Sequence, residues 1–440
     1  MILSGWGRFP VHRSVPLAPR TQDELSACLQ GQPVIARGNG RAYGDSAIGA
    51  NATILMDHFN RMLQFDTKKG ILVAEAGVLL ADIITALGPR GWFPPVTPGT
   101  KFVTLGGMIA ADVHGKNHHK DGSFGRFVDW LEVMDHTGHM HRCSAQQNTQ
   151  IFNRTVGGMG LTGTILRAAV RLHPVQTAWI KQTTKALPNL DAALAAFEKH
   201  NTATYSVAWI DCLSSSSSLG RSILMLGEHA TLKDLPDNVA SCPFKIPNKR
   251  KLNVPFSVPK GLLNRFTVRM FNALYYWRNA RRSETSLVDW DNYFYPLDAI
   301  LGWNRIYGRR GFMQFQCVLP LEMSQAGLKA LLEATSRAGA GSFLAVLKRL
   351  GPQDSVLSFP MEGYTLALDF PVSSKANALM SQLDDITVKH GGRFYLAKDA
   401  RMSAQTLRRA DPRAAKFAKM RAKEGLDTTF GSKQSERLEL

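Results

Sequence analysis

The sequence predicts an α+β fold of two cooperating domains, and three observations support this prediction. The chain has 440 residues, more than the roughly 100–200 residues of a usual single domain. Up to about residue 177, short apolar runs alternate with glycine-rich turns, which is typical of strands joined by tight loops. Beyond His173-Pro174, longer strand candidates alternate with amphipathic helix candidates. We therefore expect a first domain over 1–177, a β/α second domain over 178–392, and a return of 393–440 to the first domain.

The composition excludes several classes of protein. Hydrophobic residues make up 44% and charged residues 20% of the chain, which is an ordinary balance for a folded core. We find no run of ~18 apolar residues that could span a membrane and no signal peptide at the start. The 5 cysteines are scattered and form no C-x-x-C pair, which disfavours a disulfide framework or a zinc site. These features indicate a protein of the reducing cytoplasm.

Helices are expected to be few in the first domain. TQDELSACLQ (21–30) begins with the N-cap candidate Thr21, and LLADIITALGPRG (79–91) has apolar residues at helical spacing before Gly88 and Gly91. We expect TLGGMIAADVHG (104–115) to be a strand that runs into a glycine turn.

The second half is expected to hold most of the long elements. The strand candidates are YSVAWIDCL (205–213), RSILMLGEH (221–229), GFMQFQCVLP (311–320), SFLAVLKRLGP (342–352) and YTLALDFPV (364–372). The helix candidates are 321–339, 374–392 and a basic segment at 408–425. The serine run 214–218 is expected to be a plain loop.

Three glycine-rich stretches in the first domain suit a long, phosphate-bearing ligand. They are VIARGNGRAYGDS (34–46), residues 98–119 and VGGMGLTGTI (156–165). Glycine permits close approach of backbone N–H groups to a diphosphate, and arginine can neutralise its charge. The glycine spacing of the first loop, with no helix after it, does not fit a Rossmann fingerprint. A tight surface turn explains that loop equally well, but three such loops in order favour a bound cofactor.

The ordered motifs resemble those of one flavoprotein superfamily. They are R-G-x-G-R-x-Y-G-D, P-G-T-x-x-V-T-x-G-G, D-x-H-G-K-N-H-H, G-S-F-G and G-G-x-G-L-T-G. This set is similar to the vanillyl-alcohol-oxidase type (PCMH-type) of FAD-binding oxidoreductases. Within it, GWGR, HGKNHH, WNRIYG and AKDAR most resemble the decaprenylphosphoryl-β-D-ribose 2′-oxidase group. The resemblance implies a PCMH-type FAD-binding domain with a β/α substrate (cap) domain.

The resemblance also implies which residues contact FAD. They are Ala36, Arg37, Gly38, Asn39, Gly40, Arg41, Ala42, Tyr43, Gly44, Asp45, Ser46, Gly99, Thr104, Leu105, Gly106, Gly107, Ala111, Asp112, Val113, His114, Ile165 and Tyr395. In related oxidases a histidine after the first glycine loop often bonds covalently to the flavin. The equivalent stretch here is Gly40-Arg41-Ala42, so we expect FAD held without a covalent bond.

Catalytic and substrate-binding residues follow from the same resemblance. Lys398, Tyr43 and His114 are the expected catalytic residues, and Lys116, Gln314, Gln316, Lys348 and Thr365 the expected substrate-binding residues. A lysine near the flavin stabilises the negative charge left by reduction, whereas an ion pair with Asp399 is the alternative role for Lys398. Half-exposed positions on a strand are the alternative for the two glutamines. His114, His118 and His119 lack partners that would complete a ligand set, so we expect no metal.

The charge of the chain is uneven. The formal net charge is +18, and residues 245–282 contain many Lys and Arg, interleaved with aromatic residues, and no Asp or Glu. This composition suits peripheral contact with the inner membrane face, and a solvated loop explains it equally well. Basic and aromatic mixtures also suit single-stranded nucleic acid, but the sequence has no recognised nucleic-acid module, so we expect no such partner.

The resemblance therefore implies oxidation of the 2′-hydroxyl of polyprenylphosphoryl-β-D-ribose, a lipid-linked sugar phosphate. A separate reductase would complete epimerisation to arabinose for the cell wall. An aldonolactone or polyol oxidase on the same scaffold is the first alternative. A basic lipid- or nucleic-acid-binding protein with a vestigial flavin fold is the non-enzymatic alternative.

Overall fold

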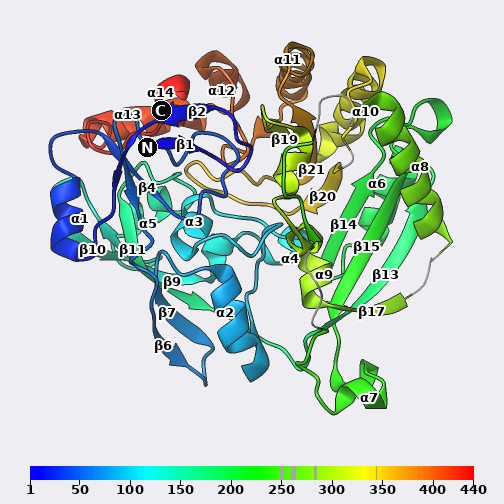
Figure 1. Cartoon of the computed structure of the whole chain (residues 1–440), viewed down its shortest axis with the longest axis horizontal. Coiled ribbons are helices and arrows are strands. Elements are labelled where there is room, and N and C mark those ends of the chain that lie inside the picture. The colour runs from blue at the N-terminus through cyan, green and yellow to red at the C-terminus, as the bar shows by residue number, and fades with distance from the viewer. Residues whose placement is uncertain (248–251, 259–263, 282–284, 343) are drawn as a thin grey trace.

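The computed structural model describes residues 1–247, 252–258, 264–281, 285–342 and 344–440. Figure 1 shows two lobes side by side, the first built mainly from the N-terminal half and the second around one large sheet. Within the described residues, no helix is both long and apolar enough to span a bilayer.

The first lobe is built on two sheets. A five-stranded antiparallel sheet has the order β10-β9-β11-β7-β6 (Met140–Cys143, Val128–Met134, Thr164–Arg171, Ile71–Glu75, Met62–Asp66). A three-stranded parallel sheet has the order β3-β5-β4 (Val15–Leu17, Ala52–Leu55, Val34–Arg37). The smaller elements are β1 (Ile2–Ser4), β2 (Val11–Arg13), β8 (Trp92–Phe93), β12 (His173–Pro174), α1 (Gln22–Cys28), α2 (Leu80–Leu87), α3 (Leu105–Ala110), α4 (His118–Asp121) and α5 (Thr149–Thr155).

Helices α1 and α2 confirm the sequence prediction. The Thr21 hydroxyl accepts the N–H of Glu24 at 3.2 Å, which satisfies a donor that the first turn of α1 would leave unpaired. Helix α2 has Gly88 at its C-cap, and Gly91, with φ of 81°, ends the short turn that follows. Left-handed backbone of this kind favours glycine.

The expected strand at 104–115 is wrong, because residues Leu105–Ala110 form helix α3. The Thr104 hydroxyl accepts the N–H of Gly107 at 3.3 Å and so caps the helix. A Cβ at Gly106 would lie 2.8 Å from the Cβ of Ala76. The glycine therefore allows the helix to pack directly on the strand connection, and it does not mark a turn.

The second lobe is an eight-stranded antiparallel sheet of order β17-β13-β15-β14-β20-β21-β19-β22. Its strands are Thr285–Asp289, Trp179–Leu187, Ser222–His229, Tyr205–Ile210, Val346–Leu350, Gly363–Pro371, Phe312–Pro320 and Arg393–Phe394. All five strand candidates are confirmed, and so are the helices at α10 (Leu321–Ala338) and α11 (Ser374–Lys389). The remaining elements are α6 (Leu190–Lys199), α7 (Asp237–Ala240), α8 (Arg265–Ala280), α9 (Trp290–Phe294), and the pair β16 (Leu252–Asn253) and β18 (Ile300–Leu301). The serine run contains a short 3-10 turn, Ser216–Ser218, within a loop.

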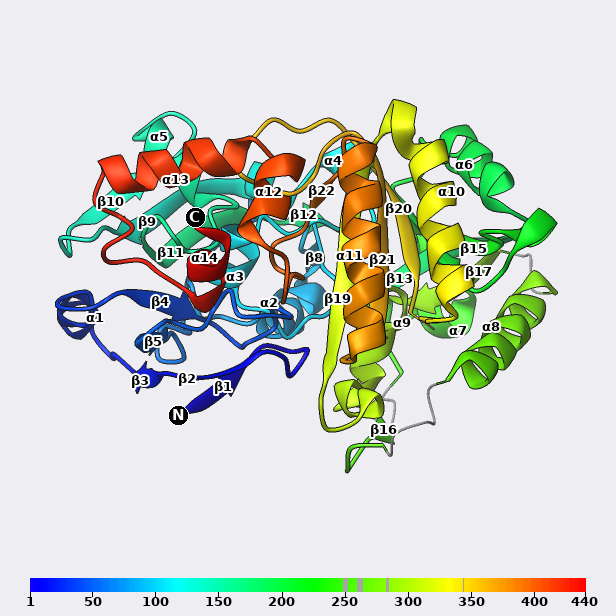
Figure 2. The same cartoon turned by 90° about the horizontal axis from the view of Figure 1, so that it is seen from above.

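Alternation along β19 separates the core of this lobe from its polar face. Phe315 and Cys317 belong to a hydrophobic core cluster with Leu328 and Leu331 of α10. Gln314 and Gln316 point to the opposite face, since successive side chains alternate along a strand. Helices α10 and α11 therefore cover one face of the sheet (Figure 2), and the other face is available to the site.

The last segment of the chain packs against the first lobe. Figure 2 shows α12 (Ala404–Ala410), α13 (Arg413–Lys423) and α14 (Lys433–Leu438) over that lobe. Gly431 donates its N–H to the Val34 carbonyl at 2.9 Å, and Arg437 pairs with Asp45 at 2.7 Å. The basic helical segment expected over 408–425 is confirmed, but it does not lie in one helix. It is two helices, because Pro412 has no N–H to continue the first.

Candidate active site

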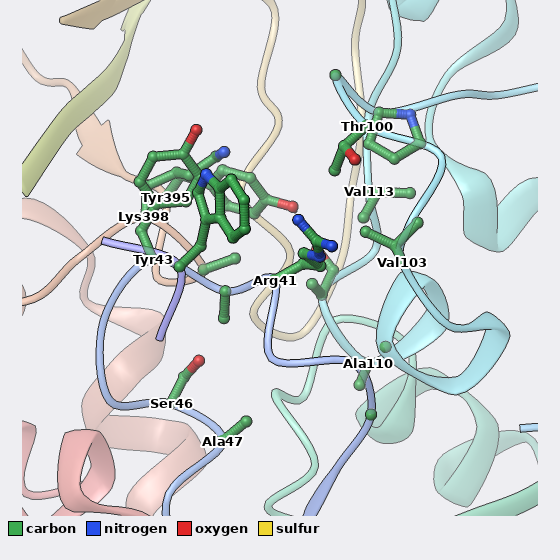
Figure 3. A pocket seen from close by; sticks show the side chains of 18 of the residues that line it. Arg41, Tyr43, Ser46, Ala47, Thr100, Val103, Ala110, Val113, Tyr395 and Lys398 are labelled. Atoms are coloured by element: carbon green, nitrogen blue, oxygen red, sulfur yellow. The ribbon is translucent and has the colours of Figure 1, made fainter. Parts of the chain in front are cut away.

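A cavity lies at the junction of the two lobes and is lined from several parts of the chain. The first glycine loop and the 98–107 segment contribute small residues and backbone, while β19, β20 and β21 contribute polar side chains. The C-terminal return contributes Tyr395, Ala397 and Lys398. In the view of Figure 3, Tyr43, Tyr395 and Lys398 gather on one side and Thr100, Val103 and Val113 on the other, with Arg41 between them.

The loop that follows β4 and the loop that precedes α3 are in direct contact. A Cβ at Gly38 would lie 2.1 Å from the Thr104 hydroxyl oxygen, and the Asn39 amide donates to the Phe102 carbonyl at 2.7 Å. Gly40 has φ of 61°, which favours glycine. Tight packing of these loops therefore leaves backbone, and few side chains, facing the cavity.

The two arginines of the first loop have different environments. Arg37 donates to the Ser4 carbonyl at 2.8 Å and to the Ala47 carbonyl at 3.3 Å, so its guanidinium holds the loop and does not line the cavity. Arg41 lines the cavity, with its guanidinium carbon 4.2 Å from the Trp6 ring centroid and 5.1 Å from that of Phe102. Arg41 is therefore the loop arginine that can meet an anionic ligand.

The cavity meets the requirements of a bound dinucleotide. Gly99 lines it with no atom within 4 Å of where a Cβ would lie, so a ligand could approach its backbone closely. The Gln316 amide donates to His114 Nε2 at 3.1 Å, so the neutral ring carries its proton on Nδ1. That buried Nδ1 has no hydrogen-bond partner among the described residues. A ligand that accepts from His114 would satisfy this donor.

Lys398 and Tyr43 come from opposite ends of the chain and meet in the cavity. Tyr43 donates its N–H to the Ala397 carbonyl at 2.9 Å, and the Lys398 amine lies 3.6 Å from the Tyr43 ring centroid. The alternative partner of Lys398, Asp399, instead pairs with Arg437 at 3.0 Å. Burial lowers the pKa of Lys398 and raises that of Tyr43.

The sheet of the second lobe supplies the polar wall of the cavity. Gln314 donates to Asp369 Oδ1 at 2.5 Å, and Gln316 donates to the Thr365 hydroxyl at 3.2 Å as well as to His114. Lys348 lies within β20 and also lines the cavity, and burial lowers its pKa to about 8. These side chains can donate to and accept from sugar hydroxyls.

Most residues expected to contact FAD or substrate line this one cavity. The exceptions are Arg37, Gly44, Asp45, Leu105, Asp112 and Lys116. A Cβ at Gly44 would lie 2.0 Å from the Asp399 carbonyl oxygen, so this glycine admits the returning tail. Leu105 is buried in the core of the first lobe. Their expected roles remain predictions.

Two of the charged members of that group, Asp112 and Lys116, have protein partners near the cavity. Asp112 accepts from Ser123 at 2.8 Å and from the Gln353 amide at 2.7 Å. The Lys116 amine donates to the Tyr293 carbonyl and lies 4.0 Å from the ring centroid of that tyrosine. Burial, with the charge of Lys348, lowers the pKa of Lys116 to about 7.

The neighbouring histidines are engaged in hydrogen bonds between segments. His118 Nδ1 accepts the N–H of Gly351 at 3.1 Å, so Nε2 donates to the Gln353 side chain at 2.9 Å. His119 Nε2 donates to the Ala203 carbonyl at 2.8 Å. Among the residues with described positions, no three His, Cys, Asp or Glu side chains are grouped as a metal site would need.

Sequence reasoning missed several cavity residues, of which Asp369 is the most important. Thr365, Ala367 and Asp369 all line the cavity from β21. The sequence could have indicated Asp369. Residues two apart on a strand share a face, and Thr365 on the same strand was already a candidate. Trp6, Asp298 and Trp303 also line the cavity. Trp6 and Trp303 lie in the GWGR and WNRIYG motifs, which were given no site role, and nothing in the local sequence indicates Asp298.

Comparison with known proteins agrees with this geometry. A family profile described as an FAD binding domain matches residues 14–144. The chain is 36% identical to decaprenylphosphoryl-beta-D-ribose oxidase of Mycolicibacterium smegmatis, over 100% of this chain and 97% of that protein. It is 30% identical to an uncharacterized protein of Streptomyces coelicolor, over 82% of this chain and 99% of that protein. It is 29% identical to L-gulonolactone oxidase of Mus musculus, over 38% of this chain and 39% of that protein.

The fold and the site together define an FAD-dependent oxidoreductase that acts on CH–OH groups, with FAD as its cofactor. Within that class, the chain belongs to the decaprenylphosphoryl-β-D-ribose oxidase family. The resemblance read from the sequence motifs is thereby confirmed.

Proposed function

We propose that the protein oxidises the 2′-hydroxyl of polyprenylphosphoryl-β-D-ribose to the 2′-keto sugar. The observation that carries this proposal is the extent of the similarity. It covers the whole chain for the decaprenylphosphoryl-ribose oxidase but only 38% for the lactone oxidase. The substrate-side strands β19, β20 and β21 therefore fall within the first comparison. The product is a ketone, so a separate reductase would be needed to complete epimerisation to arabinose for the cell wall.

The expected site residues divide the chemistry among them. When bound, FAD supplies the acceptor for the hydride that leaves the sugar C2. Lys398, Tyr43 and His114 orient the hydroxyl and take part in removal of its proton. His114 is neutral, because burial holds its pKa well below the usual range. Gln316, Thr365 and the ammonium of Lys348 bind sugar and phosphate oxygens.

Anaerobic reduction of the flavin tests the substrate class. Oxidised protein is mixed without oxygen with a prenylphosphoryl ribose and, separately, with free polyols and aldonolactones. We expect the phosphorylated ribose to bleach the flavin absorbance and the other compounds to leave it unchanged. Bleaching by polyols or lactones alone would replace this proposal with the lactone or polyol oxidase alternative.

We further propose that this protein works in the cytoplasm and contacts the inner membrane face through α8. Phe266, Met270, Leu274 and Trp277 form a stripe along this helix and are 74%, 59%, 61% and 53% exposed. Val268 and Asn272, on the opposite side, are buried. The charged residues of α8 are Arg265, Arg269 and Arg278, which complement anionic lipid. Of the rest of the basic block, Lys249, Arg250, Lys251, Lys260 and Arg282 lie outside the described residues.

Flotation with liposomes tests this contact. We expect binding to vesicles that contain phosphatidylglycerol, weaker binding in raised salt, and loss of binding in a Phe266→Ser, Leu274→Ser double variant. The matched control is a double variant of exposed apolar residues elsewhere, Val11→Ser with Val15→Ser. Absence of vesicle binding, or salt-sensitive binding to single-stranded DNA in its place, would reject the lipid contact.

A further inference from the structure

A buried carboxylate that no expected role uses lies in the wall of the cavity. Asp369, at the end of β21, is 1% exposed and lines the cavity. Gln314 donates to its Oδ1 at 2.5 Å, and the Tyr307 hydroxyl donates to its Oδ2 at 3.3 Å. Both donors are neutral. A buried carboxylate is costly unless a cation compensates its charge, so the location of the nearest cation matters.

Lys398 lines the same cavity as Asp369, and its charge interacts with that of the carboxylate. Burial lowers the pKa of Lys398, the charge of Lys348 lowers it further, and Asp369 acts in the opposite direction. Burial also raises the pKa of Asp369, whereas Lys398 and the hydrogen bonds from Gln314 and Tyr307 lower it. Each member of the pair therefore favours the charged form of the other.

The other charged and titratable groups around the pair do not replace this interaction. They are Arg41, Tyr43, His114, Asp298, Tyr307, Lys348 and Tyr395. Asp298 is the second carboxylate in the described wall, and it accepts from the Thr100 hydroxyl at 2.8 Å and the N–H of Lys101 at 2.9 Å. Its charge acts on Arg41. Asp369 is thus the carboxylate that counterbalances Lys398.

Asp369 also connects Lys398 to the rest of the wall. Gln314, which donates to Asp369, lines the cavity together with Tyr43, and it acts to lower the pKa of the Tyr43 hydroxyl. Tyr43 in turn lies beneath the Lys398 amine. One carboxylate therefore fixes the orientation of an amide that acts on the tyrosine next to the lysine.

We propose that Asp369 is a positioning residue of the active site, which keeps Lys398 in its ammonium form and holds the Gln314 amide in place. The role rests on the proposed function only in that Lys398 acts beside the flavin, and it does not depend on the identity of the sugar. The direction of the change in the pKa of Lys398 follows from the negative charge of Asp369. Without the carboxylate, Lys398 loses its proton at lower pH, so processes that need the ammonium fail at lower pH.

The test uses the FAD-loaded protein and two readouts. The first is the pH dependence of the visible flavin spectrum of the oxidised protein without substrate, which reports the charge of groups near the flavin whatever the substrate is. The second is the pH profile of anaerobic flavin reduction by prenylphosphoryl ribose. The variants are Asp369→Asn, the charge-conserving Asp369→Glu, and Asp298→Asn as the matched control. Circular dichroism and FAD content check that each variant is folded and loaded.

We expect Asp369→Asn to move the alkaline limb of both profiles to lower pH by about one unit or more. Asp369→Glu and Asp298→Asn should keep the wild-type position of that limb. A folded, FAD-loaded Asp369→Asn with wild-type profiles would overturn the proposal.

If Asp369→Asn does not fold, the Tyr307→Phe variant provides the test instead. Loss of its hydrogen bond raises the pKa of Asp369, so the acid limb should move to higher pH, and an unmoved limb would overturn the proposal.

Discussion

At the residue scale, the site is formed by side chains whose partners lie far away in the sequence. Lys398 meets Tyr43 on one side of the cavity, and His114 accepts from Gln316 of the second lobe. The resemblance of local motifs was enough to select these residues. It did not select Asp369 or Trp6, and it could not select Asp298, whose place in the wall comes only from the fold that carries it to the cavity.

Removal of the Lys398 amine should cripple reduction of the flavin and leave the cofactor bound. Lys398→Met is expected to slow substrate-driven bleaching by about 100-fold or more, the size of effect seen when a charge-stabilising group is lost from an active site. FAD content should be unchanged, because the glycine loops remain. The exposed Lys389→Met is the matched control. If the flavin of Lys398→Met were bleached by substrate at the normal rate, the role of Lys398 in the active site would be contradicted.

Buried histidines should make the fold sensitive to acid. Burial lowers the pKa of both His118 and His229 from 6.5 to about 4. The unfolded chain therefore binds more protons between those values, and the free energy of unfolding should fall as pH drops from about 6.5 to 4, by up to roughly 3 kcal/mol per group. Urea titrations at pH 7, 5.5 and 4 measure this loss.

A variant identifies the contribution of His229 to that loss. His229→Gln keeps a polar partner for the Tyr205 hydroxyl, which lies 3.0 Å from His229 Nε2, and cannot take up a proton. Its stability should decline less between pH 7 and pH 4 than that of the wild type. The exposed His58→Gln should decline as the wild type does. If the free energy of unfolding fell equally with pH in all three proteins, the contribution assigned to His229 would be contradicted.

At the scale of elements, periodicity and capping residues predicted most of the structure. Alternation predicted β19 and β21, and helical spacing predicted α10 and α11, because each has one face on the same core. Helix α3 was missed because its two adjacent glycines read as a turn. The first of them, Gly106, is explained by its close contact with Ala76, which no local pattern contains.

Helix α13 should depend on one buried arginine. Arg421 is buried and donates from Nε to the Leu161 carbonyl at 2.9 Å, and its other nitrogens donate to the Phe430 and Leu440 carbonyls. Arg421→Met would leave these buried acceptors unpaired. We expect a loss of about 2–4 kcal/mol in the free energy of unfolding and faster proteolysis of the C-terminal segment. The exposed Lys416→Met on the same helix should change neither, and an Arg421→Met variant as stable as wild type would contradict this role.

At the scale of the whole molecule, the site exists because two lobes and the tail meet. The first lobe contributes glycine loops with Arg41 and Tyr43, and the tail adds Lys398 (Figure 3). The sheet of the second lobe contributes further polar side chains. The sequence indicated that each part was present. It could not indicate how the lobes face each other, since that arrangement depends on contacts such as Gln353 with Asp112, 241 residues apart.

The central claim is that the glycine loops hold FAD without a covalent bond, in a cavity faced by Lys398. The most direct measurement is the visible absorbance of the purified protein, followed by acid precipitation. We predict flavin bands with one FAD per chain, and all of the flavin in the supernatant after precipitation, since Arg41 stands where related oxidases carry the linking histidine. A protein that stays colourless after incubation with FAD, or flavin that remains on the denatured chain, would contradict the account.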